Sequence, residues 1–361
     1  MVVFGESDTV SHHFWRFHDR SSPRFDPAGA RELGDAVLRV YRSLDAWLGR
    51  IVAQVGDDAT IAVVSDHGFQ GSATVAVHLN AALARAGLLA WRPGGGDRRQ
   101  PLAAARALAL GALPAALQER LFRWAGGVPA ARVESASRFG AIDWSRTSAV
   151  ADEVDYAPGV RICVRGRDAD GIVEPGAEFV RVRELAAACL LSLRDPVTGE
   201  PVIARVIPRE DVDHGPFARF GADLVVEPAT LAGHRVSCLR TDGPATEPVA
   251  TIDPRQRFGA KGRGMDGVHR AHGIFACAGP AVAAAGDIGV AAAADVLPTL
   301  LAAVGLCVDE GLDGRVLERV VAPPARLAPR GDLAPRGEGG WYARSASRAI
   351  ERRMRALGYL E

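Results

Sequence analysis

An apolar stripe at helical spacing is the clearest pattern in the chain, and it lies between residues 29 and 55. Its members recur at steps of three and four positions and are Leu33, Val37, Val40, Leu44, Leu48, Ile51 and Val55. Residues with this spacing share one face of an α-helix. The stripe therefore predicts a helix over residues 29–55 that turns one apolar face toward a core.

Two apolar runs flank this helix, and neither alternates polar with apolar residues. Met1–Phe4 precedes the helix, and Ile61–Val64 follows it and leads directly into the turn Ser65–Gly68. A continuous apolar run is typical of a parallel strand that is covered on both faces. Strand, helix and strand in this order predict a βαβ unit, so we expect an α/β fold with a mostly parallel central sheet flanked by helices.

The pattern changes between residues 91 and 222, and this region is predicted to form an inserted α+β cap. Helical stretches and short apolar strands are mixed there. The predicted helices lie at 102–124 and 178–193, and the predicted strands at 148–151, 160–164 and 202–206.

The residues after 222 show apolar strand patterns like those of the first part of the chain. Apolar strands at 224–226 and 274–277 resume the core, and a Pro, Gly and Arg-rich stretch follows from about residue 323. The predicted division is therefore a core part at 1–90, the cap at 91–222, a second core part at 223–320, and a linker with a C-terminal helix at 321–361.

Composition and charge narrow the classes of function. The 361 residues carry 43 Lys and Arg against 43 Asp and Glu, so the basic excess typical of a nucleic-acid binder is missing. Five widely spaced cysteines argue against a disulfide framework and a Cys-type zinc site. With no signal-peptide pattern and no apolar run of roughly 18 residues, we expect a cytoplasmic protein whose partner is neither nucleic acid nor membrane.

Asp and His concentrate in three short segments at the ends of predicted strands. The segments are Asp8–His12, Asp66–Gly68 and Gly267–Gly273. Functional groups of open α/β sheets collect at the carboxyl ends of strands. Carboxylate oxygens and imidazole nitrogens are common ligands of a catalytic zinc ion. Together the three segments predict a metal site.

Each segment taken alone has a plainer explanation. The first could be a capped loop, the second a hydrogen-bonded turn, and the histidines of the third, His269 and His272, could lie on the surface. The combination of all three favours the metal site, and it leaves open which of these two histidines is a ligand.

The same segments, in the same order, resemble the type I phosphodiesterase/nucleotide pyrophosphatase branch of the alkaline phosphatase superfamily. Ser7–Trp15 is similar to the family's D-x-x-x-H-x-F-W segment, Val64–Phe69 to its S-D-H-G strand end, and Gly267–Pro280 to its G-x-H-R…G-I-F…G-P segment. Further similar stretches are Asp143–Thr147, Gly166–Gly176, Asp295–Gly314 and Arg355–Tyr359. The resemblance implies an alkaline-phosphatase-like sandwich with an inserted cap, and hydrolysis of phosphoric esters.

The resemblance also implies two divalent metal ions. Zinc is the first expectation, and manganese and iron accept the same ligands. The residues implied for the first ion are Asp8, His12 and His269, and those implied for part of the second ion are Asp66 and His67. His269 is preferred to His272 because it stands at the family position directly before an arginine.

Two elements of the family have no matching position in this chain, namely a strand with a metal-binding Asp and a Thr or Ser nucleophile. Ser65, Ser72 and Thr74 lie near the second segment but lack the family context, so no nucleophile is assigned. Three interpretations stay open: a truncated chain, one half of a split enzyme with a separate N-terminal half, or a protein that has lost catalysis.

The leading hypothesis is a metal-dependent phosphoric-ester hydrolase that is incomplete or weakly active alone. Its substrate would be a small phosphodiester, nucleotide or related phosphate ester. One alternative is a catalytically inactive domain that binds metal or docks a partner. Another is a sulfatase-like hydrolase, which would need an oxidised Cys or Ser at the unmatched nucleophile position.

Overall fold

The structure, a computed structural model, describes residues 1–93, 139–215, 217–253, 265–283, 286–309, 311–321 and 327–328. The chain divides into two units. The first comprises Met1–Thr9, Ala36–Phe69 and the described residues from His269 onward, and the second comprises the described residues of Val10–Asp35 and Gln70–Val268.

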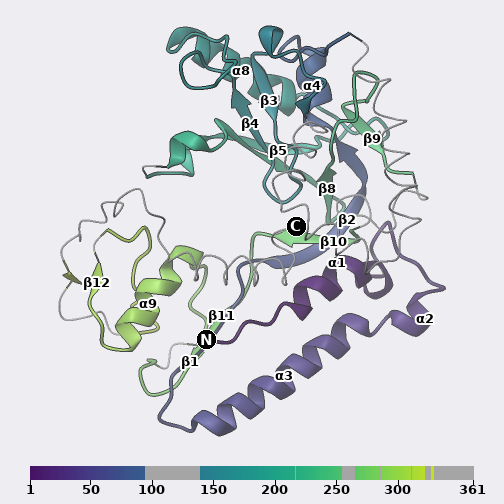
Figure 1. Cartoon of the computed structure of the whole chain (residues 1–361). Coiled ribbons are helices and arrows are strands. Elements are labelled where there is room, and N and C mark those ends of the chain that lie inside the picture. Colours follow the sequence, from purple (N-terminus) through teal and green to yellow (C-terminus); the bar gives the residue numbers. More distant parts are fainter. Residues whose placement is uncertain are drawn as a thin grey trace, which may run out of the picture. The chain divides into compact units, whose positions relative to one another are not determined.

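Three elements contribute residues to both units, because the boundaries fall inside them. They are helix α1 (Glu6–His18), strand β2 (Gly68–Val77) and strand β10 (Gly267–Arg270), all labelled in Figure 1. The predicted Asp and His segments lie on these elements or next to them. The local structure of α1, β2 and β10 therefore decides how the candidate ligands are presented.

A four-stranded antiparallel sheet of the second unit includes the strands predicted for the cap. Its order is β3 (Ala149–Ala151), β4 (Gly159–Ile162), β6 (Leu224–Pro228) and β5 (Ile203–Pro208). Strand β6, which the sequence assigns to the resumed core, pairs here with β4 and β5.

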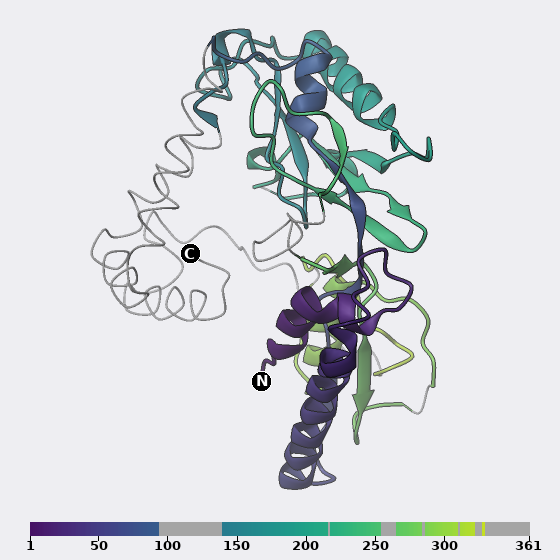
Figure 2. The same cartoon turned by 90° about the vertical axis from the view of Figure 1, so that its right-hand side faces the viewer.

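Two helices pack against this sheet and against each other. They are α8 (Ala177–Leu191) and α4 (Leu79–Arg85), and Figure 2 shows them side by side. Helix α8 buries Val182, Ala186 and Leu190, which stand four residues apart and so share one face. The helix predicted at 178–193 is thereby confirmed, and its apolar face is what attaches it to the sheet.

A second sheet of mixed direction runs through β2. Strand β2 stands between β10 and β8 (His234–Cys238), and β8 in turn pairs with β7 (Thr230–Leu231). Strand β9 (Val249–Thr251) also pairs with β2. The β2–β8 pair is parallel, whereas β2–β9 and β7–β8 are antiparallel. Every residue of β8 is buried, which marks it as an interior strand.

The first unit is built around a long helix and a short ribbon. Helix α3 (Ala36–Val55) precedes strand β1 (Ile61–Val64), which pairs antiparallel with β11 (Phe275–Ala278). The remaining helices and strands assigned to its described residues are α9 (Val296–Ala303), β12 (Val308–Asp309), β13 (Leu327–Ala328) and the 3₁₀ turn Ala293–Asp295. The predicted helix at 29–55 is largely confirmed, although a separate short helix, α2 (Ala30–Leu33), occupies its first turn.

The prediction of an α/β fold is confirmed at the level of a mixed α/β structure, but a mostly parallel sandwich is not, because the described strand pairs are largely antiparallel. Ile61–Val64, predicted as a central parallel strand, pairs antiparallel, and Val64 is 44% exposed. Met1–Phe4, predicted as a strand, forms no regular element. A short apolar run predicts an extended segment, but it carries no information on the direction of its neighbour.

The hydrophobic core of the described residues lies mainly in the second unit. Large side chains there are fully buried, among them Leu79, Leu83, Ile142, Ile162, Leu190, Ile203 and Leu224. In the first unit the buried apolar residues of the described part are Ala36, Val37, Pro298, Val308, Val320 and Val321. The first unit thus leaves much of its apolar surface uncovered.

Some predictions fall on residues that the structure does not describe. These are the helix at 102–124 and the C-terminal helix, together with the stretch Arg355–Tyr359. None of the helices in the described ranges combines the length and apolar character needed to cross a membrane.

Candidate metal centre

Helix α1 presents the first candidate ligands. The sequence analysis placed Asp8–His12 at the end of a predicted strand, with a capped loop as the plainer explanation, whereas Glu6–His18 forms a helix that buries Val10, Ser11 and Phe17. Glu6 and Asp8 stand in its first turn, where negative charge stabilises the helix dipole. Asp8 and His12 are four residues apart, so both side chains lie on one face of the helix.

The Asp8 carboxylate faces two imidazoles from elsewhere in the chain. Its Oδ1 lies 3.5 Å from Nε2 of His269 on β10 and 3.8 Å from Nε2 of His67, which directly precedes β2. The rings of His67 and His269 are stacked, with centroids 3.6 Å apart and planes inclined by 17°. One carboxylate oxygen therefore stands next to the Nε2 atoms of two nearly parallel rings.

Asp8, His12 and His269 together form a group with the spacing of metal ligands. Each offers one ligand atom, and these atoms all lie within 4.8 Å of one another. All three residues are half-buried, so the group is accessible yet partly shielded from water. The three residues that the resemblance assigns to the first ion are the ones brought together.

The ring of His12 is held by the backbone of β10. Its Nδ1 lies 2.8 Å from the carbonyl oxygen of Gly267. An Nδ1–H that donates to this carbonyl leaves Nε2 unprotonated, which is the usual arrangement of a metal-binding histidine. The Nδ1 of His67 is likewise 3.1 Å from the Gly68 carbonyl oxygen, so its Nε2 is the atom left to face Asp8.

Asp66 lies beside His67 but is more exposed. Its side chain is 78% exposed, and its Oδ1 accepts a hydrogen bond from the His67 backbone N–H at 3.1 Å. The same oxygen is 3.6 Å from His67 Nε2. Asp66 and His67 are thus brought together, with Asp66 at the solvent side.

Close packing of two turns fixes the position of His67. Ser65 N–H donates to the Ile274 carbonyl at 3.0 Å, and Ile274 N–H donates to Ser65 Oγ at 2.7 Å. A Cβ on Gly68 would lie 2.1 Å from the His272 carbonyl oxygen, and one on Gly273 would lie 2.3 Å from Ser65 Oγ. Only glycine fits at these two positions without displacing the neighbouring turn.

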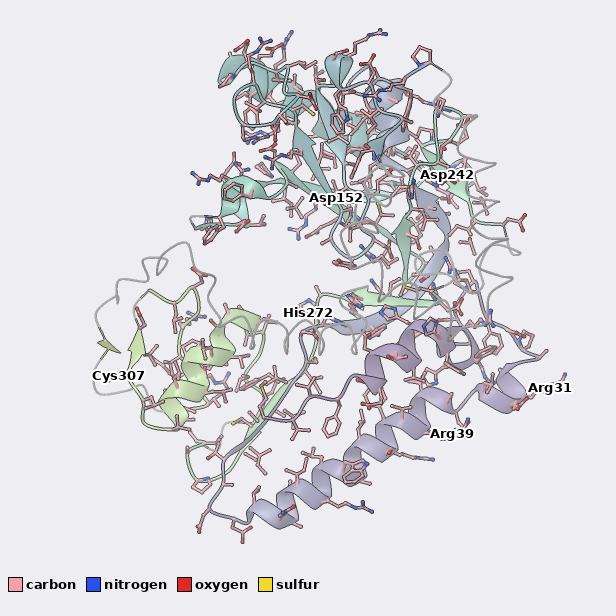
Figure 3. The ribbon with its side chains drawn as sticks, in the orientation of Figure 1. Arg31, Arg39, Asp152, Asp242, His272 and Cys307 are labelled. Carbon is pink, nitrogen blue, oxygen red and sulfur yellow. The ribbon has the colours of Figure 1, made fainter. Side chains whose placement is uncertain are left out.

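His272, the alternative to His269 left open by the sequence and labelled in Figure 3, is an exposed residue. It does not belong to the group of metal-ligand spacing found among the described residues. The two histidines differ because β10 carries His269 toward Asp8, whereas His272 stands beyond the end of that strand.

The hydroxyls considered as nucleophiles are engaged or enclosed. Ser65 Oγ accepts the hydrogen bond from Ile274, and Ser72 is buried with its Oγ donating to the Met265 carbonyl at 2.8 Å. Thr74 lies within β2 and is half-buried. None of the three is assigned as a nucleophile.

Sequence reasoning missed two features of the site. One is the stacking of His67 on His269, since no local spacing joins these residues. The other is the role of the Asp266–Gly267 pair, whose backbone holds His12 from both sides: Asp266 N–H donates to the His12 carbonyl at 2.9 Å, and Gly267 accepts from the ring. The only sequence signal was that Gly267 begins the G-x-H-R segment and Asp266 directly precedes it.

Comparison with known proteins identifies the family. The family model for type I phosphodiesterase / nucleotide pyrophosphatase matches residues 1–215, a range that includes Asp8, His12, Asp66 and His67. Neither a curated protein nor a solved structure matches the chain. Because the family match spans 215 of the 361 residues, the chain belongs to the type I phosphodiesterase/nucleotide pyrophosphatase family of phosphoester hydrolases.

Proposed function

We propose that this protein is a metal-dependent hydrolase of small phosphate esters, with a phosphodiester or nucleotide as the preferred class of substrate. The observation that carries the proposal is the convergence of Asp8, His12 and His269 within ligand distance of one another. Family membership supports the reaction, because this is a family of phosphoester hydrolases.

The donor set suits a divalent cation of the zinc type. One carboxylate oxygen and two imidazole nitrogens match the three protein ligands of many catalytic zinc sites, which keep a further position open. The ring of His12 already carries the carbonyl hydrogen bond that orients metal-binding histidines. Manganese and iron accept the same ligands, so zinc is the first ion to test.

The stacking of His67 on His269 supports two ions rather than one. The two rings lie face to face, and the Nε2 atom of each lies near the Asp8 carboxylate. The ring centroids are 3.6 Å apart, a spacing similar to the roughly 3.5–4 Å between the ions of two-metal hydrolases, so each ring would serve a different ion. Asp8, His12 and His269 would hold the first ion, and Asp66 and His67 would supply part of the second set.

Bound divalent cations would polarise the phosphoryl oxygens and stabilise the charge that develops on the attacking and leaving oxygens. The chain itself supplies the frame for this chemistry. Asp8 places a negative charge next to the Nε2 atoms of two stacked imidazoles. The carbonyls of Gly267 and Gly68 fix the tautomers of His12 and His67. The hydrogen bond between Ser65 and Ile274 holds the turn that carries His67 in position.

We further propose that the chain alone turns over slowly, because no residue is assigned as the nucleophile. A separate N-terminal segment or chain would supply the nucleophile and complete the second ligand set. Uncovered apolar side chains of the first unit support such a partner: on helix α3 they are Leu38, Tyr41, Trp47, Val52 and Val55, each at least 43% exposed. A metal-binding domain without catalysis and a sulfatase-like hydrolase are the competing outcomes.

The experiment is a metal and activity measurement on the purified full chain. We expect bound zinc in the wild type, its loss in His12→Ala, and its retention in the control His272→Ala. We also expect slow but zinc-dependent hydrolysis of a chromogenic phosphodiester. Retention of zinc in His12→Ala would overturn the metal site. Zinc binding with no hydrolysis of phosphodiesters, monoesters or sulfate esters would favour the inactive domain, and preference for the sulfate ester would favour the sulfatase-like reaction.

A further inference from the structure

The segment Met265–Gly267 packs very closely against helix α1 where that helix presents His12. A Cβ on Gly267 would lie 2.3 Å from the carbonyl oxygen of Ser11 and 3.1 Å from the Cβ of Trp15. This approach lets the Gly267 carbonyl accept from His12 Nδ1 while Asp266 N–H donates to the His12 carbonyl. The ring and the main chain of His12 are therefore held by adjacent residues of one segment.

The carboxylate of Asp266 is buried and faces two guanidinium groups. Its side chain is 3% exposed, with Oδ2 at 3.5 Å from Arg16 Nε and Oδ1 at 3.9 Å from Arg24 Nη1. Arg16 is on α1, one turn beyond His12. Asp266 therefore contacts helix α1 in two ways. Its carboxylate attracts Arg16, and its backbone N–H donates to the His12 carbonyl.

Arg24 joins this carboxylate to the sheet. Its side chain is 1% exposed, and it donates to the Ala73 carbonyl through Nε and Nη2 and to the Met265 carbonyl through Nη1. Ser72 N–H donates to the Asp266 carbonyl at 2.9 Å. Strand β2, segment 265–267 and helix α1 are consequently held together around one buried acid.

We propose that Asp266 is a positioning residue for metal binding: it holds segment 265–267 against α1 so that the Gly267 carbonyl keeps His12 in the tautomer with a free Nε2. This inference rests on the proposed metal site. Asp266 is not a member of the group of candidate ligands, and it acts through Gly267, through the backbone of His12 and through the charges of Arg16 and Arg24.

Removal of this negative charge would weaken metal binding in two ways. Without the carboxylate, segment 265–267 loses its attraction to α1, so the hydrogen bond that orients His12 weakens. Arg16 and the buried Arg24 would also be left without this counter-charge close to His12, and their positive field would oppose a cation. Loss of partners that orient metal ligands typically weakens metal affinity about 10–100-fold.

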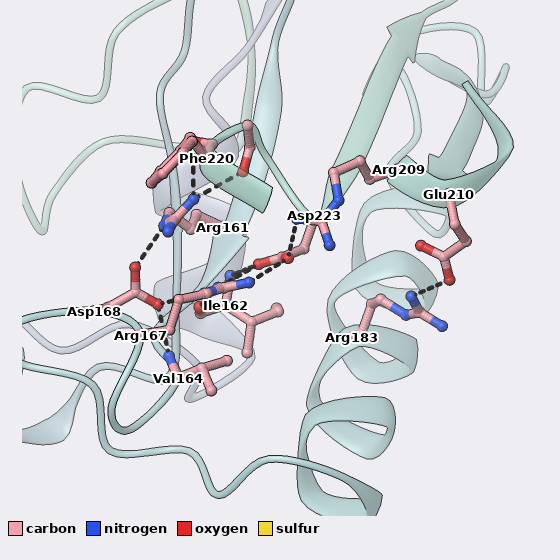
Figure 4. A network of polar contacts seen from close by, with 11 residues as sticks. Arg161, Ile162, Val164, Arg167, Asp168, Arg183, Arg209, Glu210, Phe220 and Asp223 are labelled. Atoms are coloured by element: carbon pink, nitrogen blue, oxygen red, sulfur yellow. Dashed lines mark hydrogen bonds and ion pairs between the residues drawn. The ribbon is translucent and has the colours of Figure 1, made fainter. Parts of the chain in front are cut away.

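The second unit contains a matched control in Asp223. This carboxylate is also buried and accepts hydrogen bonds from two arginines, Arg167 and Arg209, as Figure 4 shows. It further accepts from the backbone N–H of Ile162 at 2.8 Å. Asp223 has no contact with the His12 segment among its hydrogen bonds, so Asp223→Asn reproduces the loss of a buried acid between arginines without the effect on His12.

The test compares zinc titrations of the full-length wild type, Asp266→Asn and Asp223→Asn, with thermal unfolding measured for each. We expect the Kd for zinc to rise about 10–100-fold in Asp266→Asn and to stay within about twofold of wild type in Asp223→Asn. An unchanged Kd in a folded Asp266→Asn, or an equal rise in both variants, would overturn the proposal. If Asp266→Asn does not fold, Arg16→Gln replaces it, because it removes the partner of the Asp266 carboxylate on α1, and a wild-type Kd for zinc in that variant would contradict the positioning role.

Nuclear magnetic resonance of the histidine rings separates this inference from the metal site itself. In metal-free wild type, His12 should carry its proton on Nδ1, and in the folded Asp266 variant it should become a mixture of both tautomers. Asp223→Asn should keep the wild-type tautomer. If the wild type binds no zinc, the proposed function fails, while the tautomer measurement still decides the role of Asp266. An unchanged tautomer in the Asp266 variant would overturn the positioning role of Asp266.

Discussion

Oδ1 of Asp8 lies 3.5 Å from Nε2 of His269, and this pair joins the first helix of the chain to a strand outside the family-matched residues. The same oxygen is 3.8 Å from Nε2 of His67. A single carboxylate therefore stands where the two proposed ligand sets meet. Replacing ligands on either side of it should affect metal binding in distinguishable ways.

The two histidines of the G-V-H-R-A-H segment should differ in their effect on metal content. His269→Ala removes a ligand next to Asp8, so we expect zinc content to fall to the level of His12→Ala. His272→Ala removes an exposed ring outside the group and should keep the wild-type content. Elemental analysis of the purified full-length proteins measures both. Equal zinc in the two variants would contradict the assignment of His269.

A partial second set predicts a different result for His67→Ala. Because His67 is outside the group formed by Asp8, His12 and His269, the variant should keep the tighter zinc ion and lose a weaker one. Titration with zinc should then show one step where the wild type shows two. Loss of all zinc in His67→Ala would mean that the two ligand sets form one site.

The candidate ligands were predictable from the sequence because D-x-x-x-H and S-D-H-G are local motifs. Their convergence was predicted from their places at the ends of predicted strands. Which residues share one ion was predictable only through the family resemblance, since nothing in the local spacing relates His269 to Asp8. Helix α1 was missed because its sequence is polar and only Val10, Ser11 and Phe17 are buried. Such a helix depends on tertiary contacts, here those of segment 265–267, rather than on an apolar stripe.

The amphipathic helix α3 and the helix and strands of the cap were predictable because each carries a regular apolar pattern. The direction in which the strands pair was not predictable. Ile61–Val64 and the strands β3 to β6 pair antiparallel, and an apolar run fits either direction equally well. The ion pairs of Asp266 could not be predicted from the sequence either, because no regular spacing relates Arg16 and Arg24 to Asp266.

Helix α8 offers a direct test of the cap core. Leu190 is fully buried against the antiparallel sheet, whereas its neighbour Leu191 is 42% exposed. Leu190→Ala should lower the free energy of unfolding by about 2–5 kcal/mol, because it removes buried methyl groups and leaves a cavity. Leu191→Ala should change it by no more than about 0.5 kcal/mol. Urea titration checks both, and similar losses in the two variants would contradict the packing.

The cysteines should differ strongly in reactivity. Burial raises the pKa of the Cys163 thiol to about 11, and it raises that of Cys238 as well, whereas Cys307 is exposed (Figure 3). Since the thiolate is the reactive form, a maleimide at pH 7 should label Cys307 first. Cys163 and Cys238 should react only after unfolding in urea. Mass spectrometry of the digested protein gives the order, and early labelling of Cys163 would contradict its burial.

Glu153 should give the stability of the protein a defined dependence on pH. Burial raises the pKa of its carboxyl above the ordinary value of 4.5, although hydrogen bonds from Thr241 and Asn80 act in the opposite direction. Between the ordinary and the raised pKa, the folded state binds more protons than the unfolded state. The contribution of Glu153 is therefore fully present below pH 4.5 and is lost as the pH rises through the folded-state pKa.

The variant Glu153→Gln removes this titration while keeping the shape of the side chain. The free energy of unfolding, measured in urea at several pH values above 4.5, should decline with pH less steeply in this variant than in the wild type. Glu200→Gln, which changes an exposed glutamate, should retain the wild-type slope. A slope in Glu153→Gln equal to that of the wild type would mean that the carboxyl titrates alike in the folded and unfolded states, and that its burial does not govern its protonation.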